Sequence, residues 1–175
     1  MNVMITGAAG GLGRELANEC ASRGYNLFLT DINEEGLKRI KQGLERQFGV
    51  VIAAAACDLT DPESVDKMLA VIDKHNIRFD MLLNVAGLDF EGGFMERERE
   101  KIVKIVLLNN AATLRITHAI IKRRRPGKLF TIVFVSSLAS MFPMPLKATY
   151  AASKRFLLDF ATSLRQELKE QDVKV

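Results

Sequence analysis

Short apolar runs alternate along the chain with longer segments in which apolar residues recur every three or four positions. The runs predict strands at about residues 2–6, 26–31, 50–57, 79–83 and 129–136. The longer segments predict helices at about residues 12–24, 34–48, 62–76, 97–124 and 148–171. Alternating strands and helices are typical of a parallel sheet with helices on both faces. The pattern therefore predicts an α/β fold.

Two of the predicted strands consist almost entirely of apolar residues. Residues 50–56 and 130–135 lack the polar alternation of a half-exposed strand, so we expect both to be buried on both faces. With 175 residues, 48% of them hydrophobic, the chain is long enough to bury one substantial core. We therefore expect a single domain over residues 1–175.

A glycine-rich turn follows the first predicted strand. The segment Thr6-Gly7-Ala8-Ala9-Gly10-Gly11-Leu12-Gly13 leads directly into a helical pattern. Strand, glycine turn and helix in this order are typical of a dinucleotide cradle, because glycines allow a tight turn and a close approach to the pyrophosphate. Free N–H groups at the helix start would face the anion. The alternative is a merely flexible turn.

Asp31 lies at the end of the second predicted strand. A carboxylate there can accept hydrogen bonds from the adenosine ribose and repels a 2′-phosphate, so Asp31 favours NAD over NADP. The glycine turn and the residue after this strand, Gly10 and Ile32, carry no basic side chain for such a phosphate. Asp31 or Asn33 could instead cap the helix that follows.

Tyr150 and Lys154 lie four positions apart in a predicted helix and would share one face. A neighbouring ammonium stabilises the phenolate, which makes a tyrosine a proton donor or acceptor in catalysis. Ser137 lies upstream, after the fifth predicted strand. Alone, such a pair is more often a packed ring beside a solvated amine, and Ser136 and Ser137 could simply end a strand.

Taken together, these motifs resemble the short-chain dehydrogenase/reductase family. The resemblance rests on six motifs in the family's order: Thr6-Gly7-x-x-x-Gly11-x-Gly13, Asp58-Leu59, Asn84-Val85-Ala86-Gly87, Asn109, Ser137 and Tyr150-x-x-x-Lys154. It implies a Rossmann-type doubly wound parallel sheet in three α/β/α layers, with strand order 3-2-1-4-5. The family's C-terminal strands would be missing or only begun, because residues 172–175 could only start a sixth strand.

The same resemblance implies a cofactor site. Asp58 and Leu59 would line the adenine pocket, while Asn84, Ala86 and Gly87 would pass beside a ribose, although Val85 stands where the family usually has a second asparagine. The full set of expected cofactor contacts is Thr6, Gly7, Gly11, Leu12, Gly13, Asp31, Asp58, Leu59, Asn84, Ala86, Gly87, Tyr150 and Lys154.

The implied catalytic residues are Ser137, Tyr150, Lys154 and Asn109. Ser137 would bond the substrate oxygen, Tyr150 would exchange a proton with it, and Lys154 would favour the phenolate and bind the nicotinamide ribose. Asn109, next to a second asparagine at 110, would hold a water linked to the lysine. The implied function is an NAD(H)-dependent oxidoreductase that interconverts a secondary alcohol and a ketone.

The alternative is a non-catalytic dinucleotide-binding or interaction module, or an inactive fragment of a longer dehydrogenase. Family members usually continue for roughly another third of their length, through the part that covers the substrate. We expect a small alcohol or carbonyl compound as the substrate. Because the family's substrate-covering part lies beyond the motifs found here, the sequence does not indicate which compound it is. A fifth strand left at the sheet edge would also expose an apolar surface.

Charge and composition exclude several other classes. The net charge is +4 and the pI about 9.2, but residues 122–125 form the one basic run, and we expect it to be solvated at a helix end rather than to bind nucleic acid. His75 and His118 have no spacing of metal ligands. Cys20 and Cys57 are expected to be buried small hydrophobes rather than a disulfide.

No apolar stretch is long enough to cross a bilayer, and because Met1 leads directly into the first predicted strand, no signal peptide is expected. A cytoplasmic protein without membrane contact is the expectation. In the family, the helix at 97–124 and the one carrying Tyr150 form subunit interfaces, so a homodimer or homotetramer is expected. Residues expected to meet a partner helix are Ile102, Ile105, Val106, Leu108, Ala111 and Ala112.

Overall fold

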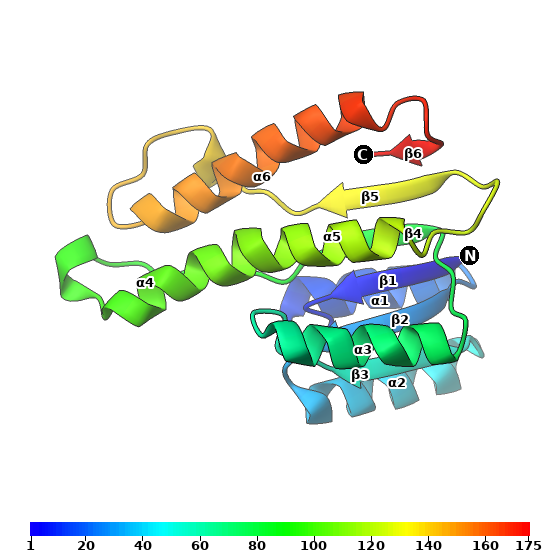
Figure 1. Cartoon of the computed structure of the whole chain (residues 1–175). Helices are drawn as coiled ribbons and strands as arrows, with labels where there is room; N and C mark the ends of the chain where they lie inside the picture. Colours follow the sequence, from blue (N-terminus) through cyan, green and yellow to red (C-terminus); the bar gives the residue numbers. More distant parts are fainter.

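A computed structural model describes all 175 residues, and a single six-stranded sheet runs through it (Figure 1). All neighbouring strands are parallel, in the order β3-β2-β1-β4-β5-β6. The strands are β1 (Asn2–Thr6), β2 (Asn26–Asp31), β3 (Ile52–Ala56), β4 (Met81–Asn84), β5 (Phe130–Phe134) and β6 (Val173–Lys174). The predicted order 3-2-1-4-5 is confirmed, and β6 is the begun sixth strand.

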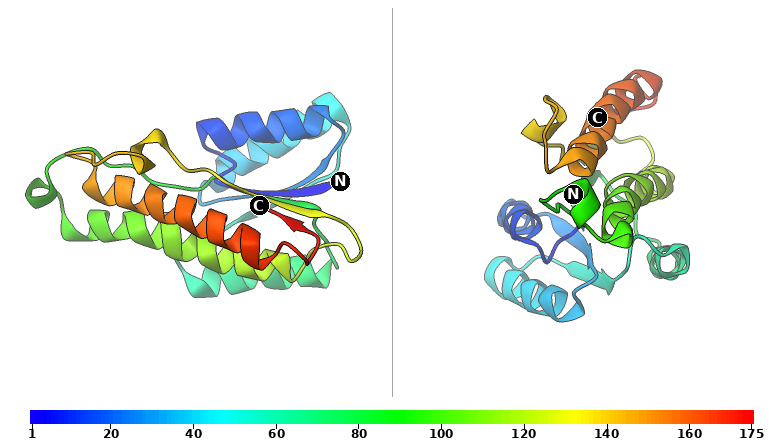
Figure 2. Two further views of the ribbon diagram at one scale, coloured as in Figure 1. Left: turned by 90° about the horizontal axis from the view of Figure 1, so that it is seen from above. Right: turned by 90° about the vertical axis from the view of Figure 1, so that its left-hand side faces the viewer.

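Helices cover both faces of this sheet, so the three layers are confirmed. Figure 2 shows α1 and α2 on one face and α3, α5 and α6 on the other. The helices are α1 (Gly11–Ser22), α2 (Glu34–Phe48), α3 (Pro62–Lys74), α4 (Arg99–Val106), α5 (Thr113–Ile121) and α6 (Ala148–Glu167).

Local sequence signals set the ends of two helices. The Asn33 side chain accepts a hydrogen bond from the N–H of Gly36 and so caps α2, which ends at Gly49 with a φ of 67°. Asp61 caps α3 by accepting from the N–H groups of Glu63 and Ser64, and Pro62 occupies the first turn.

The central strand β1 supplies side chains to two separate cores. Val3 and Ile5 point toward α1 and α2, and pack with residues such as Leu29. Met4 points to the opposite face, into a larger cluster with α3 and α5 that includes Phe79. Side chains alternate along a strand, so a strand buried on both faces needs apolar residues at every position.

The expectation that the strands at 50–57 and 129–136 are buried on both faces is wrong. The strand β3 starts only at Ile52 and lies at the sheet edge, where Ala54 and Ala56 are exposed. On β5, Val133 is 40% exposed. Val133 pairs with Leu83 and so faces the side that carries α1 and α2, but these helices contact β1, β2 and β3 rather than β5.

The strand β6 covers the beginning of β5. Val173 pairs with Phe130 and is only 6% exposed, and the N–H of Phe130 donates to the carbonyl of Asp172. The apolar edge expected at β5 is therefore partly covered, although β6 spans two residues only.

The predicted helix at 97–124 is not one regular α-helix. Between α4 and α5, residues Leu107–Ala112 form a π-helix, which we call the π segment. A π-helix contains an extra residue in its turn, and such segments often occur at functional sites. The sequence pattern does not reveal it, because the apolar residues on both sides keep a helical period.

Two of the residues expected to meet a partner helix are instead buried within the chain. Ile105 is 2% and Ala112 1% exposed. Val106 does lie on the surface, where it joins Val103 and Leu107 as an exposed apolar residue. An interface at α4 and α6 stays a prediction, and its exposed apolar side chains would include Val103 and Leu107 beside the expected Val106.

Two of the four residues of the basic run at 122–125 form ion pairs. Arg123 pairs with Asp73, and Arg125 with Asp80, at 2.6 Å and 2.7 Å. The run lies at a helix end as expected, because Arg123 and Arg124 donate to the carbonyls of Ala119 and Ile121 in the last turns of α5, but Arg123 is largely withdrawn from solvent. Cys20 and Cys57 are buried and unpaired, as expected. None of the helices combines the length and apolar character needed to span a bilayer.

Candidate functional site

A cleft of about 480 Å³ opens at the carboxyl ends of the central strands. It is formed by the loops after β1, β2, β3 and β4 together with one side of α4 and the π segment. In open parallel sheets, ligands bind at this edge, where the strand order reverses. The lining residues predicted from the sequence are Gly7, Gly11, Leu12, Gly13, Asp31, Asp58, Leu59, Ala86 and Gly87.

Two glycines of the loop after β1 have no room for a side chain. Gly7 has a φ of 67°, and a Cβ atom there would come within 2.7 Å of the Cα of Ala86. A Cβ atom on Gly13 would lie 2.1 Å from the carbonyl oxygen of Gly7. By contrast, a Cβ on Gly11 would contact nothing within 4 Å. Gly7 and Gly13 shape the loop, while Gly11 faces open space in the cleft.

The start of α1 is left available to an anion. Gly10 forms its N-cap, and no side chain accepts a hydrogen bond from the first turn. Leu12, in this turn, is 52% exposed and lines the cleft, so it does not belong to the buried stripe of α1 formed by Ala17 and Cys20. A glycine loop with uncapped N–H groups fits the pyrophosphate of a dinucleotide.

Thr6 does not line the cleft but holds one of its loops in place. Its hydroxyl accepts hydrogen bonds from the N–H groups of Val85 and Ala86, at 3.0 Å and 3.1 Å, and its side chain is buried. Asn84 is also buried and donates to the hydroxyl of Thr117. Neither side chain reaches the cleft surface, so in this structure both hold the loop after β4 in place.

Asp31 is tied to the glycine loop. Its Oδ2 accepts from the N–H of Ala9 at 2.9 Å, and its Oδ1 accepts from the N–H of Asn33 at 3.0 Å. The cap of α2 is Asn33, so the alternative role of Asp31 as that cap does not apply. Asp31 lines the cleft beside Ile32, at the place where an adenosine ribose is expected.

Asp58, which follows β3, also lines the cleft with its carboxylate. Its Oδ1 accepts from the hydroxyl and the N–H of Thr60, and these hydrogen bonds, the hydroxyl's first, hold its pKa below the ordinary value. Lys104 of α4 lies in the same cleft and lowers this pKa further. Leu59, the next residue, lines the cleft although it is only 6% exposed, and its carbonyl accepts from Arg115.

Lys154 lies deep beside the cleft, on α6. Its ammonium is 5.7 Å from the centre of the Tyr150 ring and donates to the carbonyl of Val135 at 2.8 Å. Burial lowers the pKa of Lys154, and the carboxylate of Asp89 opposes this effect in part. A Cβ on Gly87 would lie 3.4 Å from this ammonium, so the Tyr150–Lys154 pair borders the cofactor cleft.

Asn109 connects three parts of the site. Its Oδ1 accepts from the N–H of Leu88, and its Nδ2 donates to the carbonyl of Leu88 and to the hydroxyl of Ser153. The side chain is fully buried and lies on the π segment. With its amide engaged in this way, Asn109 holds the loop after β4 against α6. The neighbouring Asn110 donates to the carbonyl of Ser153 instead.

Ser137 and Ser136 have different environments. Ser137 is half-buried, and its hydroxyl accepts from the N–H of Ala139 at 3.2 Å, at the start of a short 3₁₀ turn. The hydroxyl of Ser136 donates to the carbonyl of Lys154. Ser136 therefore holds α6 in place, and Ser137 stays the predicted substrate contact.

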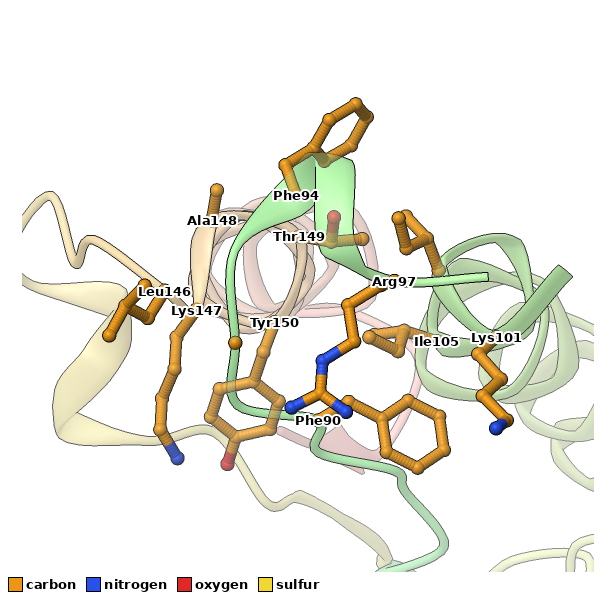
Figure 3. A pocket seen from close by; sticks show the side chains of 12 residues that line it. Phe90, Phe94, Arg97, Lys101, Ile105, Leu146, Lys147, Ala148, Thr149 and Tyr150 are labelled. Carbon is orange, nitrogen blue, oxygen red and sulfur yellow. The ribbon is translucent and has the colours of Figure 1, made fainter. Parts of the chain in front are cut away.

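A second, smaller pocket adjoins Tyr150, and the sequence interpretation missed it. Figure 3 shows Tyr150 there with Lys147, Arg97 and Phe90. Lys147 precedes Tyr150 by three positions, a spacing that places both on one side of a helix start and could have signalled the contact. No group of His, Cys, Asp and Glu side chains is arranged to hold a metal ion.

The model of the short chain dehydrogenase family matches residues 1–175, so this chain belongs to that family. The very-long-chain 3-oxoacyl-CoA reductase of Candida glabrata is 32% identical, over 98% of this chain and 53% of its own length. The protein of the same description from Neurospora crassa is 33% identical, over 98% and 53%. The chain thus spans about half the length of the curated relatives it matches.

Solved structures agree with this assignment. A short-chain dehydrogenase from Sphingobium yanoikuyae, in complex with NADPH, has a TM-score of 0.88 and 30% identity, covering 98% of this chain and 67% of that one. The bulky-bulky ketone specific alcohol dehydrogenase of Comamonas testosteroni has a TM-score of 0.90 and 26% identity, covering 98% and 69%.

Proposed function

We propose that this chain provides the nucleotide-binding and catalytic part of an oxidoreductase that interconverts a secondary alcohol and a ketone with NAD(H). The observation that carries the proposal is the contact between two halves of the site. Gly87 of the cofactor cleft lies against both Lys154 and Asn109, so a nicotinamide bound there would reach the side of Tyr150. When bound, the nicotinamide would supply or accept the hydride at the carbinol carbon.

The chain's own residues would handle the proton. In the reducing direction, the Tyr150 hydroxyl donates its proton to the substrate oxygen while Ser137 donates a hydrogen bond to the same atom. The phenolate that remains is stabilised by the ammonium of Lys154, which the carbonyl of Val135 holds at 2.8 Å. Solvent then returns a proton to Tyr150. In the oxidising direction the same steps run backwards.

A preference for NAD(H) over NADP(H) is part of the proposal. Its support is Asp31, whose carboxylate is fixed in the cleft by Ala9 and Asn33. A 2′-phosphate placed beside this carboxylate would be repelled. The NADPH in the Sphingobium yanoikuyae structure argues for testing both cofactors.

The relatives suggest the first substrates to test. The Candida glabrata protein is described as a very-long-chain 3-oxoacyl-CoA reductase, and the Comamonas testosteroni enzyme as specific for bulky ketones. A 3-oxoacyl thioester and a bulky ketone are therefore the first two substrate classes to test. A cytoplasmic location and a homodimer or homotetramer stay predictions.

The test begins with calorimetric titration of the 175-residue chain with NADH and, separately, with NADPH. Saturable NADH binding and much weaker NADPH binding are the expected result. Reductase activity is then measured with acetoacetyl-CoA and compared with a Tyr150→Phe variant, which keeps the ring but lacks the hydroxyl. An unchanged rate in Tyr150→Phe would refute the catalytic role. Cofactor binding without turnover on any substrate would favour the non-catalytic module.

A further inference from the structure

Two lysines, not one, place their ammonium groups over the ring of Tyr150. The ammonium of Lys147 is 5.6 Å from the centre of the Tyr150 ring, and that of Lys154 is 5.7 Å away. Lys147 is the residue just before α6, and its side chain runs beside the Tyr150 ring in Figure 3. Lys154, the lysine of the proposed mechanism, is therefore not the only ammonium over this ring.

Lys147, unlike Lys154, has acidic partners. Its ammonium forms an ion pair with Asp89 at 2.5 Å and lies 3.5 Å from Glu91. The hydrogen bond to Asp89 and these two charges raise the pKa of Lys147 above its ordinary value. Its side chain is 24% exposed, so the pair is shielded from water more than most surface pairs of this chain. Lys147 therefore keeps its positive charge near neutral pH.

The pair also joins two segments that are far apart in the sequence. Asp89 belongs to the loop after β4, which carries Gly87 and borders the cofactor cleft. A second link runs parallel to it, because the N–H of Gly92 donates to the carbonyl of Leu146. Leu146 has a φ of 66°, an uncommon conformation for a leucine, which these contacts hold in place. The loop and the start of α6 are thus fixed to each other beside Tyr150.

We propose that Lys147 and Asp89 are positioning residues for Tyr150, and that their opposed charges set how readily its hydroxyl gives up a proton. The proposal rests on the role of Tyr150 as the proton donor in the proposed function. Lys147 favours the phenolate, and Asp89 disfavours it. With the pair intact the two effects nearly offset each other, so Lys154 supplies the dominant charge.

Other charged groups face the same ring. Lys147, just before α6, and Lys154, on α6, lie over it, while Asp89 and Glu91 of the loop after β4 act on it through Lys147, with which both pair. From the side of α4, Arg97 and Lys101 line the pocket that contains Tyr150. Lys101 is paired with Glu98. A test must therefore change one charge at a time.

The composition allows a direct measurement on Tyr150. The chain contains two tyrosines and no tryptophan, so a Tyr25→Phe background leaves Tyr150 as the only phenol. Its ionisation is followed by near-ultraviolet absorbance during an alkaline titration, with circular dichroism recorded at each pH as a check of folding. This readout requires neither cofactor nor substrate. The titration can contradict the role of Lys147 and Asp89 while NADH still binds, and it can support that role while NADH does not bind. The proposal for this pair and the proposed function are therefore tested separately.

The two variants are expected to shift the titration in opposite directions. Lys147→Met leaves Asp89 unpaired, so the midpoint moves up by about 0.5–1 pH unit, whereas Asp89→Asn moves it down by a similar amount. Lys147→Arg is expected to keep the original midpoint. Lys169→Met, a control at an exposed lysine beyond α6, should leave it unchanged.

A purely structural role would give a different result, because damage to the loop would shift both variants in the same direction. That outcome, or no shift in either variant while Lys154→Met moves the midpoint, overturns the proposal. If a variant unfolds before the phenol ionises, the pH dependence of kcat with acetoacetyl-CoA replaces the titration. The pKa of the ionisation assigned to Tyr150 in that profile must then rise in Lys147→Met and fall in Asp89→Asn. If it does not, the proposal is overturned.

Discussion

The carbonyl oxygen of Gly7 occupies the space that a side chain on Gly13 would need, since a Cβ atom there would come within 2.1 Å of it. The two ends of the glycine loop therefore lie against each other. The requirement for glycine at position 13 comes from the protein's own packing, even before a cofactor is considered.

Gly13→Ala is expected to destabilise the fold by about 1–3 kcal/mol and to abolish NADH binding, because the loop must move to admit the methyl group. Chemical denaturation and calorimetry measure the two effects. Gly43→Ala serves as the control, since a Cβ at this site in α2 meets nothing within 4 Å. It should stabilise the chain by roughly 0.5–1 kcal/mol. Equal behaviour of the two variants would contradict the packing argument.

Asp31→Ala is expected to reduce the discrimination against NADPH roughly tenfold, equivalent to about 1.4 kcal/mol, because the carboxylate that opposes the 2′-phosphate is removed. The ratio of the dissociation constants for NADH and NADPH measures this. Asn33→Ala is the matched control. It removes the cap of α2 and should cost about 0.5–2 kcal/mol of stability without changing the ratio. An unchanged ratio in Asp31→Ala would exclude Asp31 from cofactor selection.

Asp80→Asn is expected to lower the stability at neutral pH by about 1.5–3 kcal/mol. Asp80 accepts from Arg125 and from the N–H of Asn2, and the hydrogen bond to Arg125 is the first cause of its lowered pKa. A carboxyl group with a lowered folded-state pKa stabilises the fold above its unfolded-state pKa, and this contribution is lost as the pH falls through the folded-state value.

The stability difference between the wild-type chain and Asp80→Asn should therefore shrink in acid, below the ordinary range of aspartate. Urea denaturation at several pH values measures it. A difference that stays constant down to the lowest pH at which the chain folds would show that Asp80 acts through packing instead of charge.

Val173→Ala is expected to cost about 1–3 kcal/mol, because a side chain that is 6% exposed is lost from the core cluster beneath β5. Lys174→Ala, at the exposed neighbouring position of β6, should change the stability by less than about 0.5 kcal/mol. Thermal unfolding of the two variants makes the comparison. If both were neutral, β6 would contribute nothing to the sheet.

The central strands and the ends of α2 could be predicted from the sequence almost to the residue. β1 and β2 match the predicted ranges 2–6 and 26–31, because strands buried on both faces give continuous apolar runs bounded by polar residues. The edge strand β3 was less clear. Its alanines give an apolar signal at any degree of burial, so the run could not reveal that Ala54 faces solvent.

For the site, residue identity and loop order were sufficient to bring the glycine loop, Asp31 and Asp58 to one cleft. The roles of Thr6 and Asn84 in supporting the cleft could not be predicted, because a motif does not tell which of its side chains point inward. The pair of Lys147 and Asp89 was also missed. Their contact depends on how a long loop folds back onto α6, and no periodic pattern encodes that.

The π segment joins two parts of one long helix that make different contacts. The helix α4 and, within the segment, Asn109 face the loop after β4 and α6, whereas beyond the segment Ile116 and Ile120 face the core and Thr117 meets Asn84. Deleting one residue from the π segment would restore a regular helix but turn everything beyond it by about 100°. The chain would then have to give up either the orientation of Asn109 or the burial of two isoleucines. Because of the extra residue, the part of the helix at the candidate site and the part in the hydrophobic core can each have the orientation that its contacts require.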